Sequence, residues 1–82
     1  MYQAKVYITL KDSILDPQGT AVKGALESLK YQNIPELRIG KYIQLQIDET
    51  DLSRAESQLK EMCEKILSNP IIENYRYDLS EG

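Results

Sequence analysis

The most regular stretch of this sequence is Leu37-Arg38-Ile39-Gly40-Lys41-Tyr42-Ile43-Gln44-Leu45-Gln46-Ile47, with apolar residues at every odd position except Lys41. Alternate side chains of a β-strand share one face, so an unbroken strand would place the Lys41 ammonium among buried apolar neighbours. An unpaired buried charge is costly. A glycine inside a strand commonly marks a bulge, a bend or the close approach of another backbone. The sequence therefore predicts that the chain bends at Gly40 and presents Lys41.

Two interpretations of residues 36–48 remain open. They form one long bent strand, or two short strands joined tightly at Gly40-Lys41. A single strand of about twelve residues would span about 40 Å, which is longer than a small isolated domain normally uses. In either case we expect part of this segment to serve a neighbouring subunit.

A strand and a helix are predicted before this stretch. Residues 2–11 alternate as in a half-buried strand, with one apolar face: Ala4, Val6, Ile8 and Leu10. Asp16-Pro17 then supplies an N-cap carboxylate followed by a proline in the first helical turn. Apolar residues continue at helical spacing at Val22, Ala25, Leu26 and Leu29. We expect this helix to cover one face of a sheet.

A second helix and a closing strand are predicted after it. Thr50 or Asp51 serves as the N-cap. The expected apolar stripe is Leu52, Ala55, Leu59, Met62, Cys63, Ile66 and Leu67. Ser68-Asn69-Pro70 ends the helix, and residues 71–79 form the last strand.

These elements predict one α+β domain spanning residues 1–82. The order is β-α-β(β)-α-β, which is related to the ferredoxin-like plan, with a long bent central strand. We expect a mostly antiparallel sheet with both helices on one face. Such a plan hosts enzymes, sensors and assembly modules, so it does not choose a function.

The composition limits the function classes. A net charge of −3 disfavours nucleic-acid and membrane partners, which require concentrated Lys and Arg. The chain has no histidine, so the commonest general base and neutral metal ligand are missing. The only cysteine, Cys63, lies in an apolar stripe and is expected to be an inert core thiol. A single cysteine and short apolar runs indicate a cytoplasmic chain.

Few residues qualify as a binding site. Arg38 and Lys41 form one basic pair that could bind a phosphate or carboxylate. In the alternative interpretation, Lys41 sits on a bend and extends its ammonium into water. Acidic residues before the second helix complement its macrodipole more readily than they bind a cation. Tyrosines suit a protein-facing surface, because each ring combines an apolar body with a polar hydroxyl.

Four short strings, taken together, point to a family: Lys5-Val6-Tyr7-Ile8-Thr9-Leu10-Lys11, Asp16-Pro17-Gln18-Gly19, Arg38-Ile39-Gly40-Lys41-Tyr42-Ile43 and Asn69-Pro70-Ile71-Ile72-Glu73-Asn74-Tyr75. Their order and spacing resemble the PurS family, the small subunit of phosphoribosylformylglycinamidine (FGAM) synthase. Nearly the whole chain shares this resemblance.

The resemblance implies a subunit with no catalytic, cofactor or metal residues of its own. Its partners would be a large synthetase, which uses ATP and Mg²⁺, and a glutaminase, in de novo purine synthesis. The small subunit would form a dimer or tetramer, bridge the other two and assist ammonia transfer to formylglycinamide ribonucleotide. The candidate interface residues are Arg38, Gly40, Lys41 and Tyr42, followed by Asp16, Pro17, Gly19, Asn69, Pro70 and Tyr75. The Asp16-Pro17 and Asn69-Pro70 pairs also have a purely structural interpretation as helix start and stop signals.

Two other classes share the predicted topology. An ACT-type regulatory domain binds small molecules, but usually has a glycine in the turn after its first strand, and residues 11–16 contain none. An acylphosphatase needs an arginine after its first strand, whereas no arginine precedes Arg38.

Overall fold

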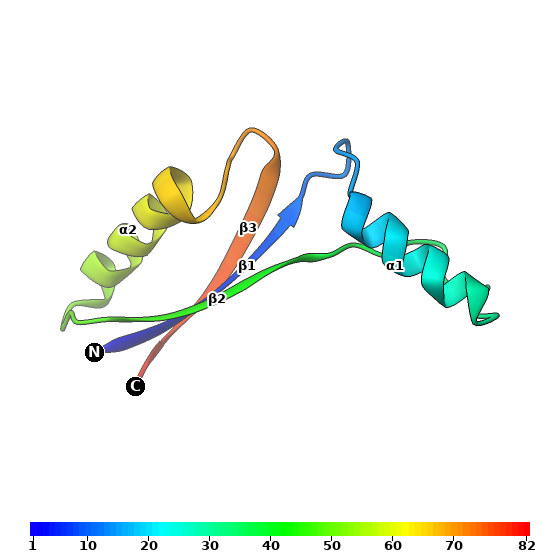
Figure 1. The fold of residues 1–82 in the computed structure, drawn as a ribbon. Coiled ribbons are helices and arrows are strands. Elements are labelled where there is room, and N and C mark those ends of the chain that lie inside the picture. Colours follow the sequence, from blue (N-terminus) through cyan, green and yellow to red (C-terminus); the bar gives the residue numbers. More distant parts are fainter.

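A computed structural model describes residues 1–82 and confirms the α+β class. The elements follow the order strand, helix, strand, helix, strand (Figure 1). Their bounds are β1 Tyr2–Leu10, α1 Pro17–Ser28, β2 Gly40–Ile47, α2 Leu52–Met62 with a final π-helical turn over Cys63–Leu67, and β3 Glu73–Glu81.

The three strands form an antiparallel sheet in the order β2-β1-β3. The pairing of β1 with β2 runs without interruption from Tyr2 opposite Ile47 to Thr9 opposite Gly40. Gly40 is therefore the first residue of β2 and no bulge forms there. Residues 36–39 lie outside the strand, so the central segment contains one strand of 8 residues, shorter than the long strand considered from the sequence.

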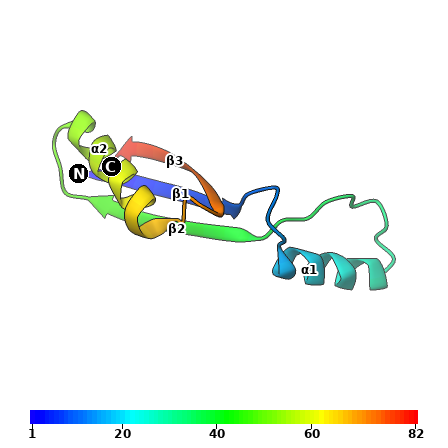
Figure 2. The ribbon, with the colours of Figure 1, turned by 90° about the horizontal axis from the view of Figure 1, so that it is seen from above.

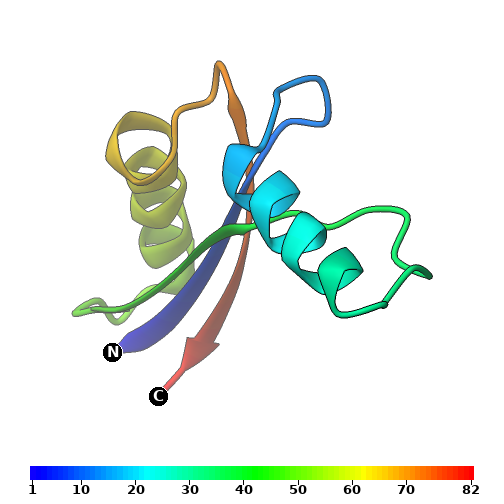
Figure 3. The ribbon, with the colours of Figure 1, turned by 45° about the vertical axis from the view of Figure 1, so that its right-hand side comes forward.

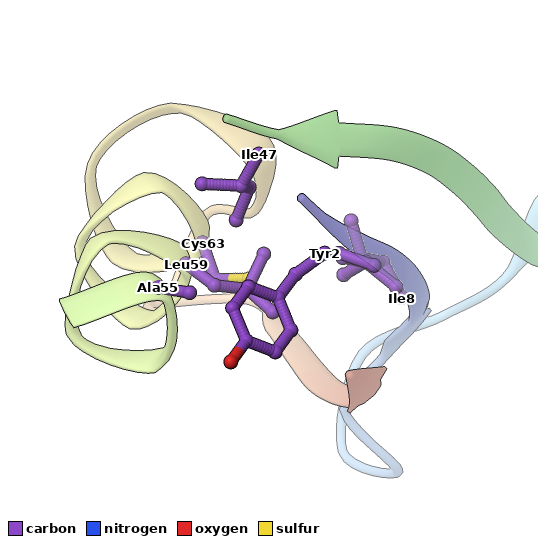
Figure 4. Packing of buried hydrophobic residues seen from close by; sticks show 8 residues of the cluster. Tyr2, Ile8, Ile47, Ala55, Leu59 and Cys63 are labelled. Atoms are coloured by element: carbon purple, nitrogen blue, oxygen red, sulfur yellow. The ribbon is translucent and has the colours of Figure 1, made fainter. Parts of the chain in front are cut away.

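The core lies between one face of this sheet and α2. Ala4, Val6 and Ile8 alternate along β1 toward the helix, as the sequence predicted, and Tyr2 extends this buried face. Leu10, predicted on the same face, is only partly buried. They pack with residues from β2 and α2: Ile47, Ala55, Leu59 and Cys63 (Figure 4). Asp51 caps α2 by accepting a hydrogen bond from the Ser53 N–H at 2.9 Å. We call this face of the sheet the inner face.

The end of α2 departs from the predicted apolar stripe. Its last turn is π-helical, with the Ser68 N–H bonded to the Cys63 carbonyl at 2.9 Å. A wider turn shifts the helical phase, so Leu67 packs against the core while Ile66 is 81% exposed. Leu52, at the start of the helix, is also half exposed. The prediction that both residues join the core was wrong.

The position of α1 also differs from the prediction. This helix does not cover the sheet. It lies beyond the sheet end from which β1 leaves and β2 enters (Figures 1 and 2). Seen from the side, it points away from the α2 layer (Figure 3). Gly19 is its only buried residue. Two connections link the helix to the sheet: residues 11–16, which contain a turn closed by the Ile14 N–H and the Lys11 carbonyl, and residues 35–39.

The chain is consequently elongated. Its radius of gyration is 16.2 Å, against about 12 Å expected for a compact domain of this length. Only 11 of 82 residues are buried. No helix has the length and apolar character that crossing a membrane requires.

Candidate functional site

Most of the predicted interface residues meet at the base of α1. Here the outgoing connection from β1 and the returning connection to β2 run side by side. A cavity of about 320 Å³ opens at this point on the inner face, beyond the part covered by α2. Its lining residues are Ile8, Leu10, Asp16, Pro17, Gln18, Ile39, Gly40, Lys41 and Glu73.

Asp16 is buried and holds two chain segments together. Its Oδ1 accepts a hydrogen bond from the Gly19 N–H at 2.9 Å, which caps α1. Its Oδ2 accepts one from the Ile39 N–H at 2.8 Å, in the segment entering β2. These N–H donors, together with the positive charge of Arg38, lower the pKa of Asp16. The sequence predicted the cap but not the bond to Ile39.

Arg38 also bonds within the chain. Its Nη2 donates to three carbonyl oxygens of the outgoing connection, those of Leu10 at 3.1 Å, Lys11 at 2.9 Å and Ile14 at 3.3 Å. This arrangement does not favour the predicted binding of one ligand by Arg38 and Lys41 together. Arg38 joins the two connections instead.

Two glycines permit close approach of backbone segments here. A Cβ at Gly19 would lie 2.6 Å from the Leu37 carbonyl oxygen, and one at Gly40 would collide with the Ile8 carbonyl oxygen. Of the three possibilities raised for Gly40, a bulge, a bend or the close approach of another backbone, the structure shows the close approach. The approaching strand is β1.

Lys41 keeps the inward register predicted from the alternation, opposite Ile8. The cost of burial is avoided because α2 does not extend over this end of the sheet. The Lys41 side chain is 66% exposed, and its Nζ lies 3.7 Å from a carboxylate oxygen of Glu73, which is only 12% exposed. Glu73 was missed from the sequence. The sequence signal that could have identified Glu73 is a charged residue at an inward position of a strand, as for Lys41.

Tyr42 lies on the opposite face, which we call the outer face. Its ring centroid is 5.2 Å from that of Tyr7, and the guanidinium of Arg76 lies 4.1 Å from the Tyr7 ring centroid. These three residues occupy one row across β2, β1 and β3. The row forms a polar and aromatic surface that no helix covers.

The C-terminal candidates stabilise the turn before β3. Asn69 Oδ1 accepts from the Ile71 N–H at 3.1 Å, and the Asn69 N–H donates to Glu73 at 2.7 Å. These bonds agree with the structural interpretation of Asn69-Pro70. Tyr75 lies on the inner face and donates to Glu64 of α2 at 3.4 Å. Partial burial and the Glu64 charge raise the pKa of Tyr75.

The chemistry available at this site is limited. No group of three or more His, Cys, Asp or Glu side chains is placed to hold a metal ion. Cys63 is fully buried, and burial raises the pKa of its thiol. The charged groups at the base of α1 are engaged with backbone groups or with each other, an arrangement suited to holding surfaces in place.

Comparison with known proteins gives consistent similarities over the whole chain. Residues 3–81 match the family model described as PurS, phosphoribosylformylglycinamidine (FGAM) synthase. The FGAM synthase subunit PurS of Bacillus subtilis is 51% identical over 99% of this chain and 95% of its own length. PurS of Synechocystis is 43% identical over 96% of this chain and 79% of its own.

Solved structures agree with this match. Bacillus subtilis PurS superposes with a TM-score of 0.87 at 51% identity, covering 99% of this chain and 100% of its own. Methanocaldococcus jannaschii PurS, one of the subunits of formylglycinamide ribonucleotide amidotransferase, gives 0.86 at 33% identity over 100% and 99%. A chain of the Thermotoga maritima PurLQS structure gives 0.86 at 26% identity over 95% of each chain. These similarities give no support to an ACT-type regulatory domain.

Proposed function

The chain belongs to the PurS family of FGAM synthase subunits, and from this premise we propose that it bridges the catalytic subunits of that complex. It is part of a ligase assembly and has no catalysis of its own. The observation that carries the proposal is the family match over residues 3–81. The Thermotoga maritima PurLQS structure supports it, because a chain of the same fold occurs there within an assembly.

The partners we propose are a large ATP-dependent synthetase and a glutaminase. The glutaminase releases ammonia, and the synthetase adds it to formylglycinamide ribonucleotide in purine synthesis with ATP and Mg²⁺. This chain assists the ammonia transfer by holding the two enzymes together and binds no cofactor. It works in the cytoplasm.

A homo-oligomer, either a dimer or a tetramer, is part of the proposal. Isolated helices of about 12 residues are marginally stable in water, yet α1 packs extensively against neither the sheet nor α2. Leu15 and Leu29 at its two ends are 76% and 69% exposed. The inner face beside Lys41 is uncovered as well. A second copy that buries both surfaces would supply the missing core.

The test is a comparison of glutamine-dependent and ammonia-dependent FGAM synthesis by the synthetase and glutaminase, with and without this chain. We expect the chain to restore glutamine-dependent turnover and to leave ammonia-dependent turnover nearly unchanged. The chain alone serves as the control and should be inactive. Equal glutamine-dependent turnover without the chain would refute the bridging role.

A further inference from the structure

We propose that Asp16 and Arg38 form a latch that fixes the direction of α1 relative to the sheet, and so positions this helix for assembly. The two residues then act through α1 and do not themselves contact a partner. This inference rests on the proposed function and names the device that makes the assembly surface rigid.

The first argument is that the Asp16 carboxylate accepts two hydrogen bonds from different segments of the chain. One oxygen accepts from Gly19 inside α1, and the other accepts from Ile39 in the connection to β2. A helix cap requires only the first of these bonds. The second joins residues that are 23 positions apart in the chain. A buried carboxylate bonded on both sides leaves the base of α1 little freedom to rotate.

Arg38 supplies the second argument from the opposite connection. A single guanidinium nitrogen, Nη2, donates to the carbonyls of Leu10, Lys11 and Ile14, so it holds the end of β1 and the loop that follows. Asp16 thus reaches from the outgoing connection to the returning one, and Arg38 reaches back. The two residues link the same pair of segments in both directions.

Little else holds α1 in place. The helix makes no extensive contact with another helix or strand. One exposed hydrogen bond, from Lys23 Nζ to the Pro35 carbonyl at 2.9 Å, links its middle to the returning segment. Gly19 lets the Leu37 backbone approach the first helical turn, which brings the Ile39 N–H within reach of Asp16. Within one copy of the chain, the direction of α1 therefore depends on the latch.

The variant Asp16→Asn separates the latch from the cap. Asparagine caps helices about as well as aspartate, but an NH2 group replaces one of the two carboxylate oxygens. An oxygen that accepts from Gly19 therefore leaves an N–H donor, and no acceptor, facing the Ile39 N–H. Asp51→Asn is the matched control, because Asp51 caps α2 through the Ser53 N–H and bonds no returning segment. Both changes remove one negative charge at a helix start.

The direction of α1 is measured by pulsed electron spin resonance between labels at Leu29→Cys and Ser57→Cys, with Cys63 replaced by Ala. Labelled chain is diluted in unlabelled chain, so that the distances are those within one molecule. We expect Asp16→Asn to widen the distance distribution at least twofold while circular dichroism keeps the helix content. Asp51→Asn should leave the width unchanged. A distribution as narrow as that of the parent chain would overturn the latch.

The role in assembly is measured as the chain concentration that gives half-maximal glutamine-dependent turnover. We expect Asp16→Asn and Arg38→Ala each to raise it at least tenfold and the double variant to add little, because both changes open the same latch. Asp51→Asn should stay within twofold. A wider distribution with an unchanged half-maximal concentration would overturn the positioning role. If the parent chain itself failed to restore turnover, the proposed function would be refuted. The spin-label distances do not depend on turnover and would still test whether the latch exists.

Discussion

Replacing Lys41 by alanine is expected to leave the fold intact and to weaken assembly of the complex. Lys41 occupies an inward position of β2, yet its side chain is 66% exposed at the end of the sheet that α2 leaves uncovered. Its partner Glu73 is 12% exposed and also accepts a hydrogen bond from the Asn69 N–H at 2.7 Å. The substitution therefore removes a charge from the cavity rim without leaving Glu73 unbonded.

The expected loss of stability is small. At the Lys41–Glu73 separation of 3.7 Å, two unit charges attract by about 1 kcal/mol at the dielectric constant of water. Exposed ion pairs contribute about 0.2–1 kcal/mol once screening and side-chain entropy are included. A folded chain of 82 residues has a free energy of unfolding of about 4–12 kcal/mol. Lys41→Ala should lower it by less than about 1 kcal/mol.

The effect on assembly should be larger. A hydrogen bond to a charged group contributes about 1.5–3 kcal/mol where it is withdrawn from water, which corresponds to roughly tenfold or more in affinity. We therefore expect the chain concentration for half-maximal glutamine-dependent turnover to rise about tenfold. Urea unfolding at fixed chain concentration measures the stability. Lys65→Ala is the control, since Lys65 forms an exposed ion pair with Glu61 at 2.7 Å on α2.

Two results would refute this reasoning. Unfolding of the Lys41→Ala chain would mean that the charge is part of the folded core. Unchanged assembly, with Lys41→Ala and Lys65→Ala behaving alike, would mean that this end of the inner face contacts no partner.

Three further predictions concern the core, the helix α1 and acid stability. Leu59→Ala should lower the free energy of unfolding by about 2–5 kcal/mol, because Leu59 is fully buried; equal losses in urea titrations of Leu59→Ala and of the half-exposed Leu52→Ala would contradict the core. Gly24→Ala should raise the free energy of unfolding by about 0.5–1 kcal/mol, since a Cβ at Gly24 meets nothing within 4 Å. Gly19→Ala should lower the free energy of unfolding by about 1–3 kcal/mol, because its Cβ meets the Leu37 carbonyl. If urea titrations showed both glycine variants stabilised, or both destabilised, this account of α1 would be refuted. The lowered pKa of Asp16 predicts stability that is present above the ordinary value near 3.8 and is lost as pH falls through the lower folded-state value; an acid-unfolding profile unaltered by Asp16→Asn would contradict it.

Much of the local structure was predictable from the sequence. Alternating Ala4, Val6 and Ile8 identified β1 and its buried face, and Asp16 was correctly predicted to cap α1. Asp51, which caps α2, was one of the two predicted alternatives. These signals are local, because side-chain alternation and capping depend on neighbours within a few residues. The phase of α2 failed at Ile66, where the π-helical turn that ends with the Ser68 N–H replaced the regular spacing.

The candidate site was predictable only in part. Gly40 and Lys41 were singled out by the break in alternation, and both line the cavity, although Gly40 begins β2 and forms no bulge. Glu73 was missed because its pairing with Lys41 depends on strand order, which brings β2 and β3 to the two sides of β1. Arg38 was taken for a presented charge, since nothing in its neighbours indicates the three distant carbonyls that it bonds.

By itself the sequence determined the elements, the antiparallel α+β class and the family, because side-chain alternation, helix caps and motifs each depend on residues that are close together in the chain. The tertiary structure alone decided where α1 lies and what Asp16 and Arg38 do. Their partners, such as Ile39 and Leu10, are more than twenty residues away along the chain. Hydrogen bonds of that range form only after the strands have set which backbone groups come within reach.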